Sequence, residues 1–276
     1  MITIHQDEAR WQRTRDALRV VCAHARANHF VTAHLGRNAI PLHRLFLVPA
    51  RSASGSRVVD EQTGHAYPLD PGVALVLPAR RLYRFDFVAG LHLVGFHAGL
   101  EGPGGVDVLD GALTIAHDSG NHAAAAQAWD AVTLATPGAW LIAEGQLRLQ
   151  LGRSTTVSWE QVERATAAAR HWHKTIQRLE RAPSGGADVA VLARAAGISR
   201  QHFTRRFTAD FGCSPRTWQQ RQLARRVVER LLADDTPFEE LAADFGFSDA
   251  FAFSRFVLRQ TGMRPSVWRK QGLAVG

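Results

Sequence analysis

The chain is poor in cysteine and has no long apolar run. Its 276 residues include two cysteines, Cys22 and Cys213, too few and too isolated for a disulfide framework or a zinc site. Such sparse cysteine is typical of a reducing compartment, so we expect a cytoplasmic protein. No stretch approaches the ~18 uninterrupted apolar residues of a membrane span. Residues 1–20 also lack an apolar run, so we expect neither a membrane segment nor a signal peptide.

Lysine is scarce as well, and the basic residues are unevenly distributed. Lysine occurs only at Lys174 and Lys270, and every other side-chain cation is arginine. Residues 1–160 contain 14 Lys and Arg against 14 Asp and Glu, so the whole formal charge of +8 lies in residues 161–276. A neutral half joined to a basic half indicates that one module faces a polyanion. From charge alone, a solvated basic face without a partner is the alternative.

The pattern of apolar residues changes from strands to helices along the chain. Short apolar runs separated by Pro, Gly and Ser extend from about residue 30 to residue 97, which predicts an antiparallel sandwich or small barrel. Apolar residues at three-to-four spacing then predict helices over residues 123–134, 139–151 and 162–179. We expect the linker between two domains over residues 153–161.

A repeat occupies the C-terminal part. Residues 192–199 match residues 241–248 at an offset of 49, and residues 211–218 match residues 261–268 at an offset of 50. We place the extra residue of the second copy inside its middle helix. Two matching copies in tandem, in the basic half of the chain, are a specific pattern.

Each copy has the chemistry of a helix-turn-helix unit. Gly197 and Gly246 can adopt the left-handed conformation that stops the first helix. Ser199 and Ser248 are expected to cap the next helix. A Thr-Pro-Phe-Glu sequence before the second copy predicts a capping box.

The second helix of each unit has a buried and an exposed face. Apolar residues at i,i+4 spacing are expected to be buried, namely Phe203 and Phe207, then Phe253 and Val257. Between the units, residues 216–233 predict a linker helix that carries arginines on the face opposite its leucines, namely Arg221, Arg225, Arg226 and Arg230. Its 18 residues would span roughly 27 Å. A helix of that length can place both units in adjacent major-groove segments, which lie about 34 Å apart.

On these residues, the segment 176–270 resembles the DNA-binding domain of the AraC/XylS family of transcription regulators. The most specific stretch is residues 246–255 with Gly262 and Pro265 behind it. The resemblance implies binding to double-stranded promoter DNA and activation through contact with RNA polymerase. Its base-reading positions fall on Gln201, Thr204 and Arg205, residue types that can pair with base edges.

The full set of DNA-contacting residues that we predict lies on the second helix of each unit and its N-terminus. The set is Arg200, Gln201, His202, Thr204, Arg205, Arg206, Ser248, Asp249, Ala250, Phe251, Ser254 and Arg255. The second copy departs from the family pattern, because Ala250 and Phe251 cannot donate hydrogen bonds. We therefore expect the first unit to dominate sequence discrimination and the second to supply positioning. A merely solvated polar face is the alternative.

Residues 67–78 and the strands after them resemble, less specifically, the cupin-type sensor barrel of AraC relatives. That resemblance implies a small-molecule effector, with a sugar as one candidate, and a homodimer formed by the helices behind the barrel. Polar residues in or beside strands are the candidate effector ligands: His34, Arg44, Tyr83 and His92. We expect no cofactor and no functional metal, because the strands lack the His-x-His pair of metal-binding cupins.

The predicted fold is α+β, with a cupin-like β-barrel sensor domain and trailing helices before an all-α domain of two helix-turn-helix units. We divide the chain into residues 1–152, 153–161 and 162–276, with the units at about 188–211 and 237–261 on either side of the linker helix. The predicted function is an effector-responsive transcription activator of a catabolic or transport operon, without enzyme activity. The alternatives are a cupin-type isomerase or dioxygenase with an appended basic domain, a DNA-repair methyltransferase fused to such a domain, and an architectural DNA-binding protein.

Overall fold

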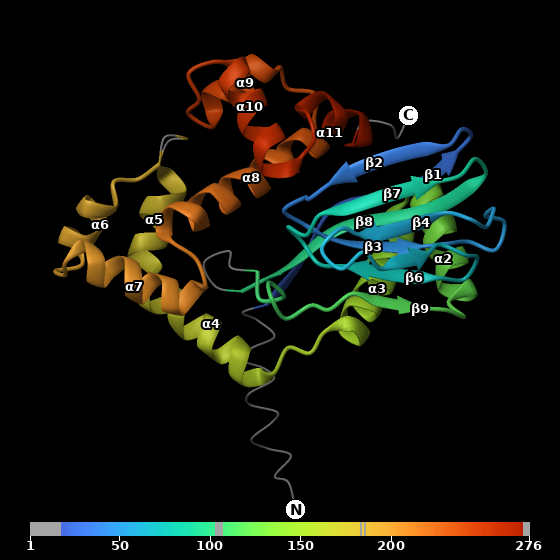
Figure 1. The fold of residues 1–276 in the computed structure, drawn as a ribbon, viewed down its shortest axis with the longest axis horizontal. Helices are drawn as coiled ribbons and strands as arrows, with labels where there is room; N and C mark the ends of the chain where they lie inside the picture. The colour runs from blue at the N-terminus through green and yellow to red at the C-terminus, as the bar shows by residue number, and fades with distance from the viewer. Residues whose placement is uncertain (1–17, 103–106, 183, 185, 273–276) are drawn as a thin grey trace, which may run out of the picture.

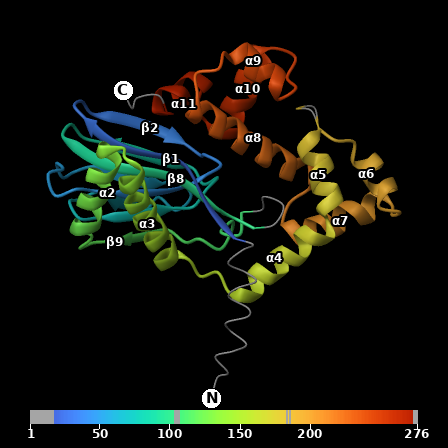
Figure 2. The same ribbon diagram turned by 180° about the vertical axis from the view of Figure 1, so that it is seen from behind.

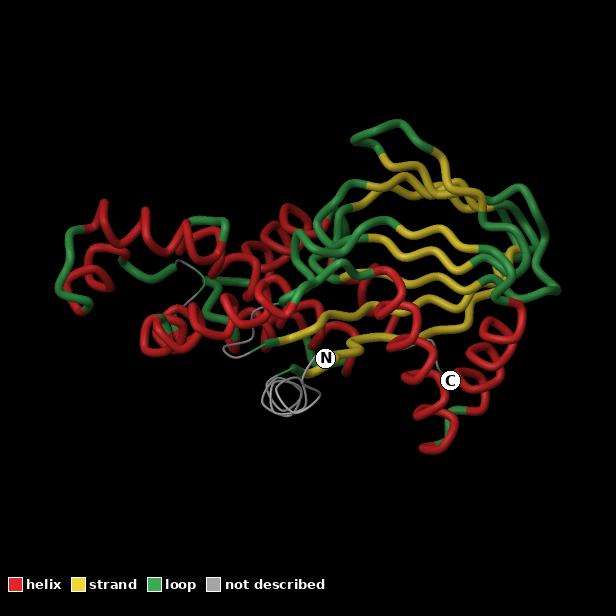
Figure 3. The backbone as a smooth tube through the Cα atoms, turned by 90° about the horizontal axis from the view of Figure 1, so that it is seen from below, coloured by secondary structure: helices red, strands yellow, loops and turns green. Residues whose placement is uncertain are grey.

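The computed structural model describes residues 18–102, 107–182, 184 and 186–272, and side chains as far as residue 270. Strands come first along the chain and helices come after them (Figure 1). Figure 3 shows the strands gathered as one block, with most of the helices to one side of it and two against it. None of the described helices is both long and apolar enough to cross a membrane.

The strands form two antiparallel sheets. One sheet has the order β1-β8-β3-β6-β9 and the other β2-β7-β4-β5. The bounds are β1 (Arg19–Phe30), β2 (His34–Asn38), β3 (His43–Leu47), β4 (Arg57–Asp60), β5 (Ala66–Pro68), β6 (Ala74–Leu77), β7 (Tyr83–Phe87), β8 (Leu91–Glu101) and β9 (Ala116–Asp118). We call this part with its covering helices the β-domain.

Period-two alternation along the strands fills two apolar layers. In β3, Leu45 and Leu47 pack in the cluster that includes the covering helices, whereas Phe46 belongs to the cluster between the sheets. The covering helices are α2 (His122–Leu134) and α3 (Pro137–Ser154), which lie against the five-stranded sheet (Figure 2). The predicted strands-then-helices architecture is confirmed.

Within the described residues, eight helices come after the β-domain, and the longest of them lies between two bundles. Their bounds are α4 (Trp159–His171), α5 (His173–Arg181), α6 (Val189–Ala195), α7 (Arg200–Phe211), α8 (Pro215–Ala233), α9 (Phe238–Asp244), α10 (Ala250–Thr261) and α11 (Pro265–Gly272). One apolar cluster joins α4 to α7 and the start of α8. The other joins the rest of α8 to α9, α10 and α11, at the opposite end of α8 (Figure 1).

The second bundle shares its core with the β-domain. Ile40 and Leu42, which lie between β2 and β3, are buried in the same cluster as Leu231 of α8 and Trp268 of α11. These two residues belong to the strand half of the sequence, yet their apolar surface is covered by helices about 190 residues further on. The bundle at this end of α8 is therefore fixed to the β-domain by apolar burial.

Two predictions about secondary structure were wrong. The strands begin at Arg19, so β1 was missed. The helix predicted over residues 162–179 is two helices, α4 and α5, because the chain turns at Trp172. The indole of Trp172 is buried against Phe203 and Phe207 and donates a hydrogen bond to Asp210 over 2.6 Å. Tertiary packing of one aromatic residue thus interrupts a continuous helical pattern.

Candidate functional site

The first helix-turn-helix unit consists of α6, the turn of residues 196–199, and α7. Gly197 has a φ of +71°, the left-handed conformation expected there. The Ser199 side chain accepts a hydrogen bond from the backbone N–H of His202 and caps α7, as predicted. Phe203 and Phe207 are fully buried and fix which face of α7 points outward.

The outward face of α7 carries the predicted polar residues. Gln201 and Arg205 lie opposite the two buried phenylalanines and are exposed, as are Arg200, His202 and Arg206; Thr204 is half-buried. The guanidinium of Arg205 lies 3.3 Å from Nδ1 of His202, one turn before it. This face presents amide, hydroxyl and guanidinium groups that can donate hydrogen bonds to a partner.

The second unit has the same plan with one change in its turn. The helices α6 and α9 are 49 residues apart, whereas α7 and α10 are 50 residues apart and equally long. The extra residue therefore lies in the turn, and its predicted place inside the middle helix was wrong. As a consequence Asp249 caps α10, accepting from the backbone N–H of Ala252 over 2.6 Å. The predicted cap, Ser248, instead donates to the Asp249 carboxylate over 2.9 Å.

The capping box predicted before α9 was also wrong. The N-cap of α9 is Pro237, which offers no capping side chain. The hydroxyl of Thr236 instead accepts a hydrogen bond from Arg230, and its backbone carbonyl accepts one from Arg269. Thr236, which the sequence pattern predicted as a cap of α9, thus bonds side chains of α8 and α11 instead.

The outward face of α10 is apolar where that of α7 is polar. Phe251 is 69% exposed and Leu258 is 43% exposed. The Arg255 guanidinium lies over the Phe251 ring, 4.6 Å from its centroid, which is the arrangement of a cation–π contact. Ser254 and Ala250 are half-buried beside them, and Ser248 and Asp249 are exposed. This face of the second unit therefore presents Arg255 beside an aromatic ring.

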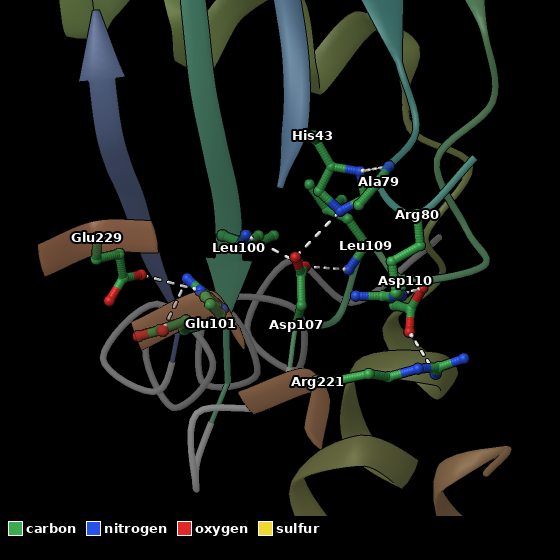
Figure 4. Close-up of polar contacts among 11 residues, drawn as sticks. His43, Ala79, Arg80, Leu100, Glu101, Asp107, Leu109, Asp110, Arg221 and Glu229 are labelled. Atoms are coloured by element: carbon green, nitrogen blue, oxygen red, sulfur yellow. Dashed lines mark hydrogen bonds and ion pairs between the residues drawn. The ribbon is translucent and has the colours of Figure 1, made fainter. Parts of the chain in front are cut away.

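Two arginines of α8 bind the β-domain. Arg225 is buried, and its Nη2 lies 2.8 Å from Oε1 of Glu101 in β8 while its Nε donates to Glu229 over 3.1 Å. Arg221 pairs with Asp110 at 3.6 Å, and Arg80 pairs with the same carboxylate. Figure 4 shows Arg221 beside Asp110 and Glu229 beside Glu101. Of the four arginines predicted on this face, Arg226 and Arg230 are exposed.

A buried His–Asp pair supports this junction. Nε2 of His43 lies 3.1 Å from the Asp107 carboxylate, and Nδ1 of the same ring accepts from the backbone N–H of Ala79 (Figure 4). Burial alone would raise the pKa of Asp107, but the hydrogen bond with His43 and the charge of nearby Arg225 hold that pKa below its usual value. The carboxylate therefore stays ionised beside α8.

The β-domain contains a cavity of about 380 Å³ that is lined by strands of both sheets. The polar side chains on its wall include His24, Arg26, Asn28, His34, Asn38, Arg44 and His97, and the aromatic ones are Phe30, Phe46, Phe85 and Phe87. This volume is in the lower part of the range of small-molecule sites, about 300–1,000 Å³.

Two of the four predicted effector ligands, His34 and Arg44, line this cavity. Tyr83 is fully buried beneath Arg44, and its ring does not reach the cavity. His92 lies on the opposite face of β8, stacked on His29 at 4.2 Å and packed against Trp129, so the structure does not bring Tyr83 or His92 to this cavity.

The β1 residues of the cavity wall were not predicted. His24, Arg26 and Asn28 line it, and they alternate with Ala23, Ala25 and Ala27 along the strand. The polar residues face inward here, so the usual pattern of apolar side chains inside is inverted. Period-two alternation of alanine with larger polar residues was the signal available.

The described residues form no metal centre. Within them, no three or more His, Cys, Asp or Glu side chains are arranged to hold a metal ion. The free cysteines Cys22 and Cys213 lie in different domains, and burial raises the pKa of the Cys213 thiol.

Comparison with known proteins supports the assignment of the two units. Residues 192–271 match the family model described as a helix-turn-helix domain. The regulatory protein Ada of Salmonella typhimurium is 36% identical over 84 residues, which are 30% of this chain. The matched part is 24% of the Ada protein, so the chain spans about a quarter of that relative.

Solved structures resemble nearly the whole fold. The structure of ToxT from Vibrio cholerae O395 has a TM-score of 0.56 at 9% identity and covers 94% of this chain and 99% of its own. ToxT of strain SCE256 with a bound unsaturated fatty acid has a TM-score of 0.54 at 10% identity, with 93% and 96% covered. At such low identity this likeness concerns the fold alone. The tandem units of residues 192–271 therefore form a helix-turn-helix domain of the AraC type.

Proposed function

We propose that the protein is a sequence-specific DNA-binding transcription regulator whose β-domain senses a small molecule. The observation that carries the proposal is the repeat in three dimensions. Two capped helices, α7 and α10, expose corresponding faces at the two ends of α8. The 19 residues of α8 span about 28 Å, which suits two recognition helices in adjacent major-groove segments.

The first unit reads bases in this proposal. Gln201 and Arg205 are exposed on the stripe opposite the buried phenylalanines. Glutamine pairs with adenine and arginine with guanine through two hydrogen bonds each. Arg200 and Arg206, at the edges of that stripe, bind phosphate groups, as do exposed arginines generally at DNA interfaces.

The second unit supplies position and apolar contact. Phe251 and Leu258 form an exposed surface on α10 that suits thymine methyl groups. Arg255 is held over the Phe251 ring and is therefore oriented before DNA arrives, which lowers the entropic cost of its contact. This division keeps sequence discrimination chiefly in α7.

The cavity is the proposed effector site, and His34 and Arg44 belong to it. The fatty-acid-bound structure of ToxT supports a ligand-binding role for a β-domain of this fold. An organic effector, bound without catalysis, is the function that we assign to the cavity in place of a cupin-type enzyme reaction. Contact with RNA polymerase, a cytoplasmic location and the division at residues 153–161 are further parts of the proposal.

The last part of the proposal is a homodimer that forms through α3. On this helix Gly138, Leu141, Gly145, Leu149 and Gly152 share one stripe, given 100° per residue. Leu141 is 67% exposed and Leu149 is 46% exposed, and a Cβ added at any of the three glycines would meet open space. Small residues beside exposed leucines let two helices pack closely. Leu147 and Leu151 of the same helix are core residues.

Selection of binding sites from random duplex DNA with the full-length protein tests the proposal. A recurring motif is expected, with affinity that falls steeply as salt rises, because arginine–phosphate contacts release counterions. Arg205→Ala should weaken binding to the motif by about 1–3 kcal/mol and relax preference at one base pair. Arg148→Ala on α3, which removes the same charge from the β-domain, is the control. Equal losses on motif and random DNA would place Arg205 on phosphate, and no binding at low salt would refute the function.

A further inference from the structure

Arg44 is a buried cation without an anion beside it. Its residue is 4% exposed, and Nη1 is buried with no hydrogen-bond partner. Its Nη2 donates to the side-chain oxygen of Asn38, which is a neutral acceptor. In the part of the chain that the structure describes, no carboxylate lies within ion-pair distance of this guanidinium. An uncompensated charge at such depth is strongly unfavourable, so the site is suited to an anion.

The neighbouring groups do not neutralise it. Burial lowers the pKa of Arg44 to about 9, which leaves the side chain cationic at neutral pH. Burial also raises the pKa of the Tyr83 phenol, so the ring below Arg44 stays uncharged. Two imidazoles of the cavity wall are neutral as well, because burial lowers the pKa of His24 to about 4 and that of His97 well below its usual value. The cavity wall therefore presents the deeply buried positive charge of Arg44, together with the half-buried one of Arg26.

Aromatic rings form one side of the wall next to Arg44. The Arg44 guanidinium lies 5.1 Å from the centroid of Phe85, and Phe85 continues into edge-on contacts with Phe46 and Phe87. A ligand that satisfies this site needs an anionic head of the size of a carboxylate and an apolar body. Arginine matches a carboxylate through two parallel hydrogen bonds, and Nη1 is unoccupied for one of them.

Three residues on the cavity wall also contact the end of the second helix-turn-helix unit. The Asn38 amide donates to the sulfur of Met263 over 3.5 Å, and the His97 ring lies edge-on to Trp268 at 5.8 Å. Arg26 donates to the backbone carbonyl of Lys270 over 3.1 Å. The two backbones come close together at Gly262, since a Cβ added there would lie 3.4 Å from Cα of Asn38. Met263, in the turn before α11, thus lines the cavity, and α11 lies directly behind residues of its wall.

The Asn38 side chain connects the buried cation to the turn before α11. Its oxygen accepts a hydrogen bond from Arg44, and its amide nitrogen donates one to the sulfur of Met263. We propose that the cavity binds an organic carboxylate with an apolar body, that the carboxylate replaces the Asn38 oxygen on Arg44, and that this exchange loosens Asn38 from Met263. The second helix-turn-helix unit then responds to the ligand through the turn before α11. This inference rests on the proposed function only where it treats that unit as DNA-binding.

Thermal unfolding of the full-length protein tests the ligand class. The probes are decanoate and 4-phenylbutyrate, each compared with its primary amide. We expect both carboxylates, and neither amide, to raise the unfolding midpoint. Arg44→Met should abolish the rise while itself unfolding no lower than the unliganded parent, because it removes an unpaired buried charge. Arg37→Met, an exposed arginine on β2, should keep the rise. Equal shifts with acids and amides, no shift with either acid, or shifts retained in Arg44→Met would overturn the ligand class.

Asn38→Asp provides a second variant, since it places a carboxylate permanently on Arg44. We expect this protein to unfold at a higher temperature than the parent and to lose its response to both acids. A lower midpoint together with an intact response would contradict the exchange at Arg44.

Hydrogen exchange tests the response of the second unit. We expect decanoate to increase amide exchange in residues 261–268 and to change the affinity for DNA at least threefold. In Met263→Leu, which keeps the bulk but cannot accept the Asn38 hydrogen bond, decanoate should still raise the midpoint without changing exchange there. Ligand binding with unchanged exchange in the parent would overturn the coupling. Absence of DNA binding without any probe would refute the proposed function and leave the thermal result standing.

Discussion

The contact between α8 and the β-domain depends on Arg225, and its removal has a predictable cost. The side chain is 6% exposed and pairs with Glu101 at 2.8 Å and Glu229 at 3.1 Å. Removal of one partner of a buried ion pair typically costs about 3–5 kcal/mol. Glu101 and Glu229 are 18% and 32% exposed, so water can partly solvate them once the arginine is gone. We therefore expect Arg225→Met to lower the free energy of unfolding by about 2–3 kcal/mol.

A double-mutant cycle with Glu101→Gln isolates the pair that joins the two domains. Urea unfolding of the full-length parent, both single variants and the double variant gives the coupling energy, which we expect to be at least about 1 kcal/mol. Arg226→Met is the matched control, because it removes an exposed arginine at the next position of α8 that donates a hydrogen bond to the backbone carbonyl of Glu180, and it should change stability by no more than about 1 kcal/mol. Single effects that add to within about 0.3 kcal/mol would show that Arg225 and Glu101 do not interact, and would refute this arrangement of α8 on the β-domain.

Three other outcomes are expected from the same structure. A fragment of residues 158–276, which keeps the Ser158 capping box, should fold at lower stability because it lacks Ile40 and Leu42 of the shared core, and it should bind DNA with a steep salt dependence but more weakly than the full chain; a folded fragment with no low-salt binding would contradict this. Gly145→Leu should turn a dimer into a monomer in sedimentation, whereas Gly145→Ala should raise helix stability by up to about 1 kcal/mol and keep the dimer; a parent that sediments as a monomer would refute the interface. Burial would raise the pKa of the fully buried Asp60, but hydrogen bonds with Arg81 and Thr63 lower it overall. Its ionisation therefore stabilises the fold above the unfolded pKa of about 3.9 and loses that effect as the pH falls through the lower folded value; urea unfolding of Asp60→Asn should show weaker acid dependence, and an unchanged pH profile would contradict it.

Local chemistry made the helix-turn-helix units predictable. Gly197 and Gly246 both have a φ near +70°, the conformation that other residues rarely adopt, and they flank helices whose buried residues recur every three or four positions. The α7 residues proposed for base contact are exposed because Phe203 and Phe207 fix the opposite face. Each of these features depends on residues within one or two helical turns, so it can be predicted from one sequence.

The errors of prediction arose where a local pattern has two physical solutions. An extra residue in the second copy fits either a longer helix or a longer turn, and the Asp249 cap selects the turn. The β1 residues look like neither a surface nor a core strand, because His24 and Asn28 face an internal cavity. The residues before and after Trp172 both follow a helical pattern. The chain turns there because the Trp172 indole packs against Phe203 and Phe207 of another helix.

Periodicity, turn residues and caps were enough to predict the class of the fold, the tandem units and the polar face of α7. They could not show that Arg225 forms an interdomain ion pair whereas Arg226 is exposed and donates to the backbone carbonyl of Glu180, because both are arginines on one helix. Nor could they place Asn38 between Arg44 and Met263, since Met263 lies 225 residues further along the chain. Such pairings are set by how whole layers pack, because a buried charge or amide takes its partner from whichever element covers it.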